Sequence, residues 1–233
     1  MVMAPPELPS TPDTDADWCL EALASHTRMP FAGIIATDAV AAPHAANSAV
    51  SSITRLTNAT WWASRSPSVR LTRTLTDYQT ALALVVSHAN SLMFIDPFID
   101  PSNVHQYSDL MTILVGLRSR STKPVVEIHR AACYGPGNDK RPRVTEVTAA
   151  LKPTLATAAR AAGISVEVFL WDEVHDRYLI SDLIGISVPY GFGTTRAPGA
   201  FTTWTRLGRT DRDSVQRDFD PAYRTPRHTF KVS

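Results

Sequence analysis

The hydrophobic pattern of the chain is clearest between residues 75 and 171, where helical periodicity and short apolar runs alternate three times. The predicted helices are 77–90, 104–118 and 144–162, and the predicted strands are 92–95, 124–129 and 164–171. This alternation is typical of parallel strands joined by covering helices. We therefore predict an α/β fold whose mixed, mostly parallel sheet is flanked by helices.

Two shorter apolar segments, 175–181 and 184–189, come next, and we predict two short strands joined at Asp182-Leu183 by a hairpin or a tight corner. The last segment, 196–233, is rich in arginine and carries eight basic and four acidic side chains, although the net charge of the whole chain is only +1. This segment could follow a phosphate backbone, form a solvated Arg/Asp surface, or dock a regulatory partner.

The N-terminal part of the chain has a weaker pattern. Residues 1–15 are rich in Pro, Thr and Asp, which is typical of a mobile leader. A short helix is predicted to begin near Asp15 or Asp17, either of which could cap it, whereas residues 31–60 show little periodicity. We predict three parts: a leader at 1–15, a helical or irregular extension at 16–74 packed on the core, and one α/β domain at 75–233.

The composition is that of a globular protein, because 44% of the 233 residues are hydrophobic and 19% are charged. No uninterrupted apolar run approaches a length of about 18 residues, so no membrane-spanning helix is expected. The first residues also lack the basic and apolar regions of a secretory signal. With only Cys19 and Cys133, a disulfide framework is not expected and a zinc site built on thiolates is excluded. We predict a cytoplasmic protein without a metal or cofactor.

One short segment carries side chains suited to phosphate chemistry. On the predicted strand 175–181, His175 and Arg177 would project to the same side, and the carboxylate of Asp182 could turn back from the strand end. An imidazole can attack phosphorus, a guanidinium can bind phosphate oxygens, and a carboxylate can fix the imidazole tautomer. The spacing predicts a phosphate-handling site, against the plainer alternative of unrelated polar residues on a surface strand.

Other residues are further candidates for the same site. Asp96 follows the predicted strand 92–95, so it is either a site carboxylate or an ordinary turn residue before Pro97. His129 is either a second imidazole in the cleft or a histidine at a strand end with some water contact. Gly191 and Gly193 could offer backbone N–H groups to phosphate, or could form a simple β-turn.

The pattern His175-x-Arg177-x-x-x-x-Asp182 resembles the His-x-Lys-x-x-x-x-Asp signature of the phospholipase D superfamily, with Arg in place of Lys. Two other segments agree with this resemblance. Phe94-Ile-Asp-Pro-Phe is similar to an upstream strand of that family that ends in Asp-Pro-aromatic, and Ile186-Ser-Val-Pro-Tyr-Gly-Phe-Gly lies where the family has a strand leading into a small-residue phosphate loop. The likeness extends over about residues 75–195.

The resemblance implies a phospholipase-D-like fold and a metal-independent phosphodiesterase of the nuclease or phospholipase type. His175 would be the nucleophile that forms a phospho-histidine, Arg177 would bind phosphate, and Asp182 would support a histidine. Because family members with one motif per chain usually build the site from two chains, the resemblance also implies a homodimer.

The Arg in place of Lys leads to an alternative. The segment is also similar to the C-terminal phospholipase-D-like module of MIT-domain proteins, which binds membrane phosphoinositides and is regarded as non-catalytic. A guanidinium is wider than an ammonium and is not a simple replacement for it in a tight site. The alternative expectation is therefore a non-catalytic module that binds the phosphate of a phospholipid or a nucleic acid.

Overall fold

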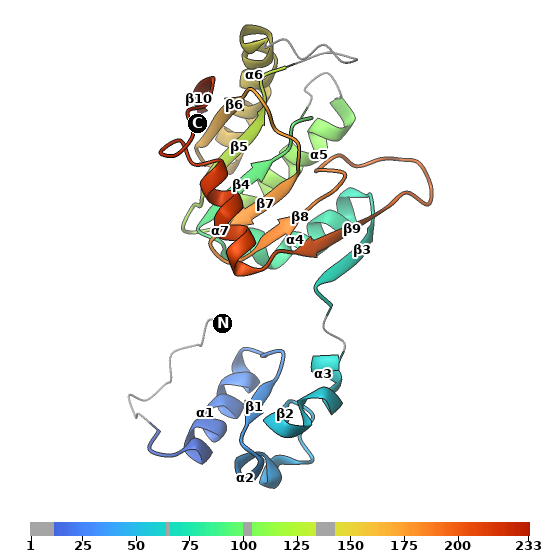
Figure 1. Cartoon of the computed structure of the whole chain (residues 1–233), viewed down its shortest axis with the longest axis vertical. Helices are drawn as coiled ribbons and strands as arrows, with labels where there is room; N and C mark the ends of the chain where they lie inside the picture. The colour runs from blue at the N-terminus through green and yellow to red at the C-terminus, as the bar shows by residue number, and fades with distance from the viewer. Residues whose placement is uncertain (1–11, 64–65, 100–103, 134–142) are drawn as a thin grey trace. The chain divides into compact units, whose positions relative to one another are not determined.

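In a computed structural model of the chain, the described residues are 12–63, 66–99, 104–133 and 143–233. They form two compact units, Met1–Ser66 and Pro67–Ser233, each of which is described by itself (Figure 1). The boundary lies eight residues before the expected start of the α/β domain at 75, because the segment before that residue contributes a strand to the larger unit. The expected leader at 1–15 lies mostly outside the described residues.

The smaller unit contains short helices around a two-stranded parallel sheet of β1 (Ile34–Ala36) and β2 (Val50–Ser52). Its helical segments are α1 (Asp15–Arg28), α2 (Asp38–Ala41), η1 (Ala42–His44), η2 (Ile53–Asn58) and α3 (Thr60–Ala63). The predicted start of α1 is confirmed, but its cap is Thr14, whose side chain accepts the Asp17 N–H while Asp17 accepts the Thr14 N–H. This reciprocal pair satisfies donors that the first helical turn leaves open.

The larger unit is built on an eight-stranded sheet in the order β10-β6-β5-β4-β7-β8-β9-β3. Its strands are β3 (Ser68–Thr72), β4 (Ser91–Ile95), β5 (Val125–Ala131), β6 (Val166–Trp171), β7 (Tyr178–Ser181), β8 (Gly185–Ser187), β9 (Phe201–Arg206) and β10 (His228–Val232). Its helices are α4 (Leu75–His88), α5 (Val104–Val115), η3 (Gly116–Ser119), α6 (Val144–Ala162) and α7 (Arg209–Asp218).

The sheet is mixed, but the prediction that it is mostly parallel is wrong. Among the described strands, only β4 with β5 and β5 with β6 pair in parallel, and the other neighbouring strands pair antiparallel. The parallel part matches the helix–strand alternation up to residue 171. After it, β7 and β8 are joined by a turn that is far too short for a parallel crossover, so they form an antiparallel hairpin.

Helices lie on both faces of the sheet (Figure 1), and successive side chains of a strand point to opposite faces. Leu92 and Phe94 of β4 belong to the large core that α4, α5 and α6 cover. Met93 and Ile95 of the same strand belong to a second cluster, which includes Phe219 at the end of α7. The sheet therefore has apolar side chains on both faces.

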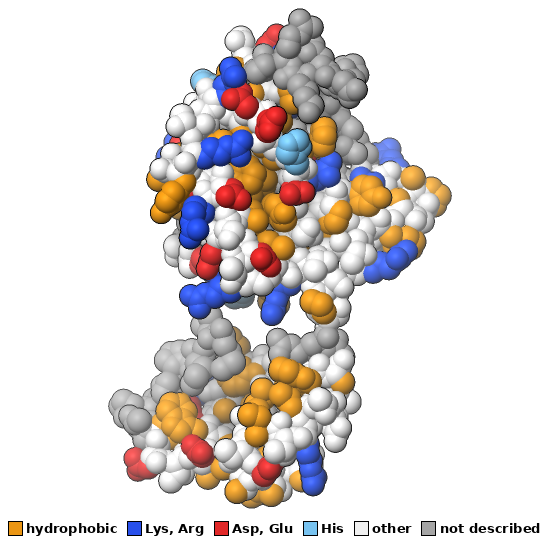
Figure 2. Space-filling model, viewed as in Figure 1, with side chains coloured by type: hydrophobic (Ala, Val, Ile, Leu, Met, Phe, Trp, Pro, Cys, Tyr) orange, Lys and Arg blue, Asp and Glu red, His pale blue; other side chains and the backbone are white. Residues whose placement is uncertain are grey.

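The arginine-rich segment 196–233 is an integral part of the larger unit. It supplies β9, α7 and β10, and its residues Trp204, Phe219 and Val232 are buried. Arg209 and Arg212 form ion pairs with Asp213. On the face drawn in Figure 2, acidic and basic side chains of this unit are interspersed, which favours the solvated Arg/Asp surface over a continuous basic track.

Among the described residues, no helix has the length and apolar character needed to cross a bilayer.

Candidate phosphate-binding site

Asp96 directly follows β4, at the edge where the parallel strands end and where open α/β sheets bind ligands. Its carboxylate is buried, with Oδ1 accepting the Phe98 N–H at 2.9 Å and Oδ2 accepting the Phe192 N–H at 3.3 Å. Burial raises the pKa of Asp96 above its ordinary value, and the two N–H groups, Arg177 and Arg130 only partly offset this effect. Asp96 thus joins the end of β4 to the loop that contains Phe192.

Arg177 lies beside this carboxylate, just before β7. Its Nε is 3.4 Å from Asp96 Oδ1, and its Nη1 donates to the Pro189 carbonyl at 2.6 Å. The guanidinium also lies over the ring of Phe98, 4.8 Å from the ring centroid. Nη2 has no hydrogen bond to any residue that the structure describes, and the side chain is 26% exposed. The guanidinium is therefore held in one orientation and keeps one edge for a ligand.

The loop from Pro189 to Gly193 packs directly on this pair. Gly191 has a φ of +63°, a conformation that favours glycine, and its N–H donates to the Val188 carbonyl at 2.6 Å. Because this N–H closes a turn, it does not point to a phosphate. The Gly193 carbonyl accepts a hydrogen bond from Arg73 Nη2 at 3.0 Å. The structure thus gives Gly191 the role of letting the loop approach Asp96 closely.

His175 does not lie on the strand. Since β7 begins at Tyr178, the alternation that would place His175 and Arg177 on one side does not extend to them. The His175 side chain is 73% exposed, and its Nε2 is 3.8 Å from Glu173 Oε2. It lines a cavity of about 460 Å³ with side chains at the end of α7, among them Phe219. The contacts of His175 and Arg177 are therefore separate.

Asp182 lies at the opposite end of β7 from Arg177. Its Oδ1 accepts the N–H groups of Asn90 and Ser91 at 2.8 and 3.3 Å, and its Oδ2 accepts the Asn90 side-chain amide at 3.0 Å. Slight burial raises the pKa of Asp182, but these hydrogen bonds outweigh it and the pKa is lowered overall. Asp182 therefore ties the β7–β8 turn to the start of β4, and within this chain it does not support His175.

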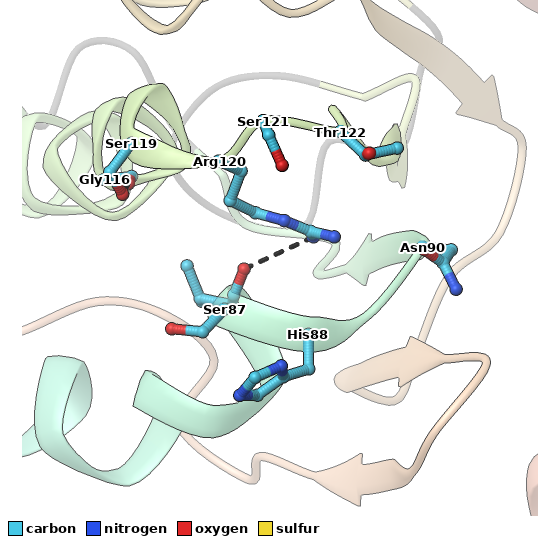
Figure 3. Close-up of a pocket in the computed structure, with 9 residues that line it drawn as sticks. Ser87, His88, Asn90, Gly116, Ser119, Arg120, Ser121 and Thr122 are labelled. Atoms are coloured by element: carbon cyan, nitrogen blue, oxygen red, sulfur yellow. Dashed lines mark hydrogen bonds between the residues drawn. The ribbon is translucent and has the colours of Figure 1, made fainter. Parts of the chain in front are cut away.

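A polar cavity of about 460 Å³ lies at the same end of the sheet, where Asn90 is one of its lining residues (Figure 3). Arg120 reaches across it to the end of α4 and donates to the Val86 carbonyl at 3.4 Å and to the Ala89 carbonyl. These are carbonyls that the last turn of a helix leaves without partners. We therefore assign Arg120 to the capping of α4, remote from Asp96.

His129 is fully buried on the face of the sheet that α7 covers. Its Nδ1 accepts the indole N–H of Trp171 at 3.1 Å, and its Nε2 is 3.2 Å from Glu127 Oε2. Burial lowers the pKa of His129, although Glu127 acts in the opposite direction. This arrangement is that of an imidazole in a packed aromatic cluster. Neither interpretation of His129 describes it, because the residue lies within β5 and has no exposed surface, so it neither faces a cleft nor contacts water at a strand end.

Three residues at this edge were not singled out from the sequence. Arg73, which follows β3, holds Gly193, and its guanidinium lies over the ring of Tyr190 at 4.7 Å. Phe98 and Tyr190 fall within the two segments that resemble the phospholipase D family, but the sequence does not reveal that their rings are exposed. Among the described residues, no group of three or more His, Cys, Asp or Glu side chains is placed to hold a metal ion.

No family model and no curated protein matches the chain. Among solved structures, it is similar to that of TrmBL2, an archaeal chromatin protein described as showing a novel mode of DNA binding. The two share 11% identity with a TM-score of 0.40, over 71% of this chain and 53% of that one, so the chain matches about half of the length of this neighbour. A likeness at this level does not identify a family.

Proposed function

We propose that the larger unit is a phosphate-binding module that recognises a phosphodiester ligand through Arg177 without cleaving it. The observation that carries this proposal is the fixed guanidinium of Arg177, whose Nε and Nη1 are engaged by Asp96 and Pro189, while Nη2 has no hydrogen-bond partner among the described residues and the side chain is partly exposed. Charge-assisted hydrogen bonds from an oriented guanidinium are well suited to phosphate oxygens. The resemblance of residues 175–182 to the phospholipase D motif is compatible with a phosphate ligand.

Binding is favoured over cleavage because the groups that hydrolysis requires are separated. A nucleophilic histidine needs a partner that orients its ring. The carboxylate of Asp182 is engaged by Asn90 and Ser91 at the far end of β7, and the only ion-pair partner described for His175 is Glu173, at 3.8 Å. Among the residues that the structure describes, therefore, no carboxylate of the same chain fixes the His175 imidazole in a catalytic orientation.

The second candidate function is a metal-independent phosphodiesterase that acts as a homodimer in the cytoplasm. The observation that favours it is the exposure of His175, which leaves its imidazole accessible to a second copy of the chain. In this candidate the two copies of His175 would act on one phosphate, one as nucleophile and the other as general acid.

The two candidates are separated by binding and cleavage assays on the full chain. The probes are a fluorescent single-stranded oligonucleotide and vesicles that contain phosphatidylinositol phosphate. Arg177→Ala is expected to weaken binding by about 1.5–3 kcal/mol, the range for charged hydrogen bonds, whereas His175→Ala leaves it unchanged. Arg206→Ala, which removes an exposed arginine of β9, is the matched control.

A different result supports the phosphodiesterase. In that case the unmodified protein cleaves the oligonucleotide or a phospholipid in the presence of EDTA, and His175→Ala abolishes both cleavage and a phospho-histidine adduct.

Because Arg177→Ala also leaves the buried Asp96 without its ion pair, Arg177→Lys is measured beside it, and thermal unfolding reports whether each variant is folded. If Arg177→Lys and Arg177→Ala both bind like the unmodified protein, Arg177 is not the phosphate ligand.

A further inference from the structure

Two exposed aromatic rings flank the candidate phosphate site. Phe98 is 66% exposed and Tyr190 is 58% exposed, although large aromatic side chains are more often buried. Both are adjacent to groups that hold Arg177. The Phe98 N–H donates to Asp96, and Tyr190 directly follows Pro189, whose carbonyl accepts from Arg177. The rings therefore lie on the two segments between which the Arg177 guanidinium is held.

Each ring is backed by a fixed arginine. The guanidinium of Arg177 lies 4.8 Å from the centre of the Phe98 ring, and that of Arg73 lies 4.7 Å from the centre of the Tyr190 ring. Neither cation is free to swing away, because Arg177 is bound to Asp96 and Arg73 is bound to the Gly193 carbonyl. One face of each ring is therefore covered by a guanidinium, and the exposed remainder is open to a flat ligand.

We propose that the ligand of the Arg177 site is a single-stranded nucleic acid whose bases stack on Phe98 and Tyr190 while Arg177 binds its backbone phosphate. This inference rests on the proposed phosphate-binding function and names its ligand. Aromatic platforms beside cationic groups bind single strands because every base offers a flat face for stacking and every linkage offers a phosphate.

A membrane surface fits these residues less well. Insertion into a bilayer would carry Arg73 and Arg177 toward the hydrocarbon region, since both are fixed against the rings. A surface that inserts into a bilayer would also be expected to carry exposed aliphatic side chains beside the site. The large exposed aliphatic residues described in this unit lie on other elements or turns: Val69, Leu84, Val125 and Leu183.

The test compares a short oligothymidylate with an abasic phosphodiester of the same length, using fluorescence anisotropy and the full chain. The unmodified protein is expected to bind the base-bearing strand more tightly. Phe98→Leu and Tyr190→Leu are each expected to weaken that binding about fivefold or more, and to leave binding of the abasic strand unchanged. Tyr190→Trp keeps a stacking surface and is expected to retain affinity.

Tyr223→Leu is the matched control, because Tyr223 is also an exposed tyrosine beside an arginine, Arg217, but it lies after α7. This variant is expected to bind like the unmodified protein. The comparison of the two strands on the unmodified protein requires no variant, so a misfolded variant does not prevent the test.

Three outcomes overturn the inference and are distinguishable from one another. In the first outcome, Arg177→Ala weakens binding, but Phe98→Leu and Tyr190→Leu bind like the unmodified protein and the abasic strand binds as tightly as the base-bearing strand. The phosphate site then stands and base stacking is wrong. If vesicles containing phosphatidylinositol phosphate bind through Phe98 and Tyr190 and the strand does not bind, the ligand is a membrane. If neither probe binds, the proposed function fails as well.

Discussion

Gly191 and Asp96 are in such close contact that a Cβ atom on Gly191 would lie 1.9 Å from Asp96 Oδ2. The first prediction is that Gly191→Ala lowers the free energy of unfolding by about 1–3 kcal/mol, because it adds this clash to the strain of a positive φ. Urea denaturation measures the change. Gly199→Ala is the control, since Gly199 also has a positive φ but would meet no atom within 4 Å. Equal losses in the two variants would show that the contact with Asp96 is not responsible.

The second prediction concerns the pH dependence that Asp96 contributes. Because its pKa is raised in the folded protein, the folded state holds a proton that the unfolded state releases between 3.8 and the raised pKa. The free energy of unfolding therefore falls as pH rises through this window. We expect Asp96→Asn to lack this fall, which is measured by urea denaturation of both proteins from acidic to neutral pH. Parallel curves for the two proteins would contradict the prediction.

The third prediction is the opposite pH dependence for Asp182. Its lowered pKa contributes stability that is present above 3.8 and is lost as pH falls through the folded-state value. Asp182→Asn is expected to remove this acid sensitivity and to cost about 1 kcal/mol at neutral pH, since the hydrogen bonds to Asn90 and Ser91 are exposed. If Asp182→Asn instead abolished ligand binding in a folded protein, Asp182 would belong to the site.

The fourth prediction is that His129 acts on stability alone. His129→Ala is expected to lower the free energy of unfolding by about 2–4 kcal/mol, because it leaves a cavity and a buried Trp171 N–H without a partner. Ligand affinity, measured at a temperature where the variant is folded, should be unchanged. The lowered pKa of His129 also implies that the unmodified protein loses stability as pH falls below 6.5, a loss that the variant should not show.

The fifth prediction is that a chain ending at Thr195 does not fold. Such a chain lacks β9, α7 and β10, and with them the buried side chains Trp204 and Phe219. Circular dichroism should show no cooperative thermal transition. Trp204→Ala, which removes one of these side chains, is expected to cost about 3–5 kcal/mol and to leave a cooperative but earlier transition. A truncated chain that folded normally would mean that segment 196–233 is an appendage.

The parallel centre of the sheet could be predicted from the sequence because β4, β5 and β6 are apolar runs separated by amphipathic helices. The edge strand β3 could not be predicted, because Leu71 is its only buried residue and no local periodicity distinguishes this segment from a loop. Its place depends on pairing with β9, a contact between distant parts of the chain. The sheet is less parallel than predicted for two reasons: β7 and β8 form a local antiparallel hairpin, and β10 pairs antiparallel with the distant strand β6.

The candidate site was predicted in part. Asp96 and Arg177 come together because Ile95 of β4 pairs with Tyr178 of β7, and Gly191 joins them from the loop after β8. His175 and Asp182 belong to the same short motif but lie apart from these three residues. His175 precedes the first residue of β7, so strand alternation does not place it beside Arg177, and Asp182 follows the last residue of β7, at the opposite end of the strand. Arg73 was not identified, since its role comes from the loop that it contacts in space.

The pairing of β3 with β9 has a consequence for how the larger unit assembles. Leu71 and Thr202 are neighbours in the sheet but are about 130 residues apart in the chain. Closing so long a loop is entropically costly, and folds rich in such distant contacts form slowly. During synthesis, β3 emerges among the first strands of its unit yet must wait for β9 before it has a partner. The backbone N–H and C=O groups of β3 therefore stay unpaired until β9 has been made. The charged and polar side chains of β3 suit a strand that must avoid pairing with other chains until then.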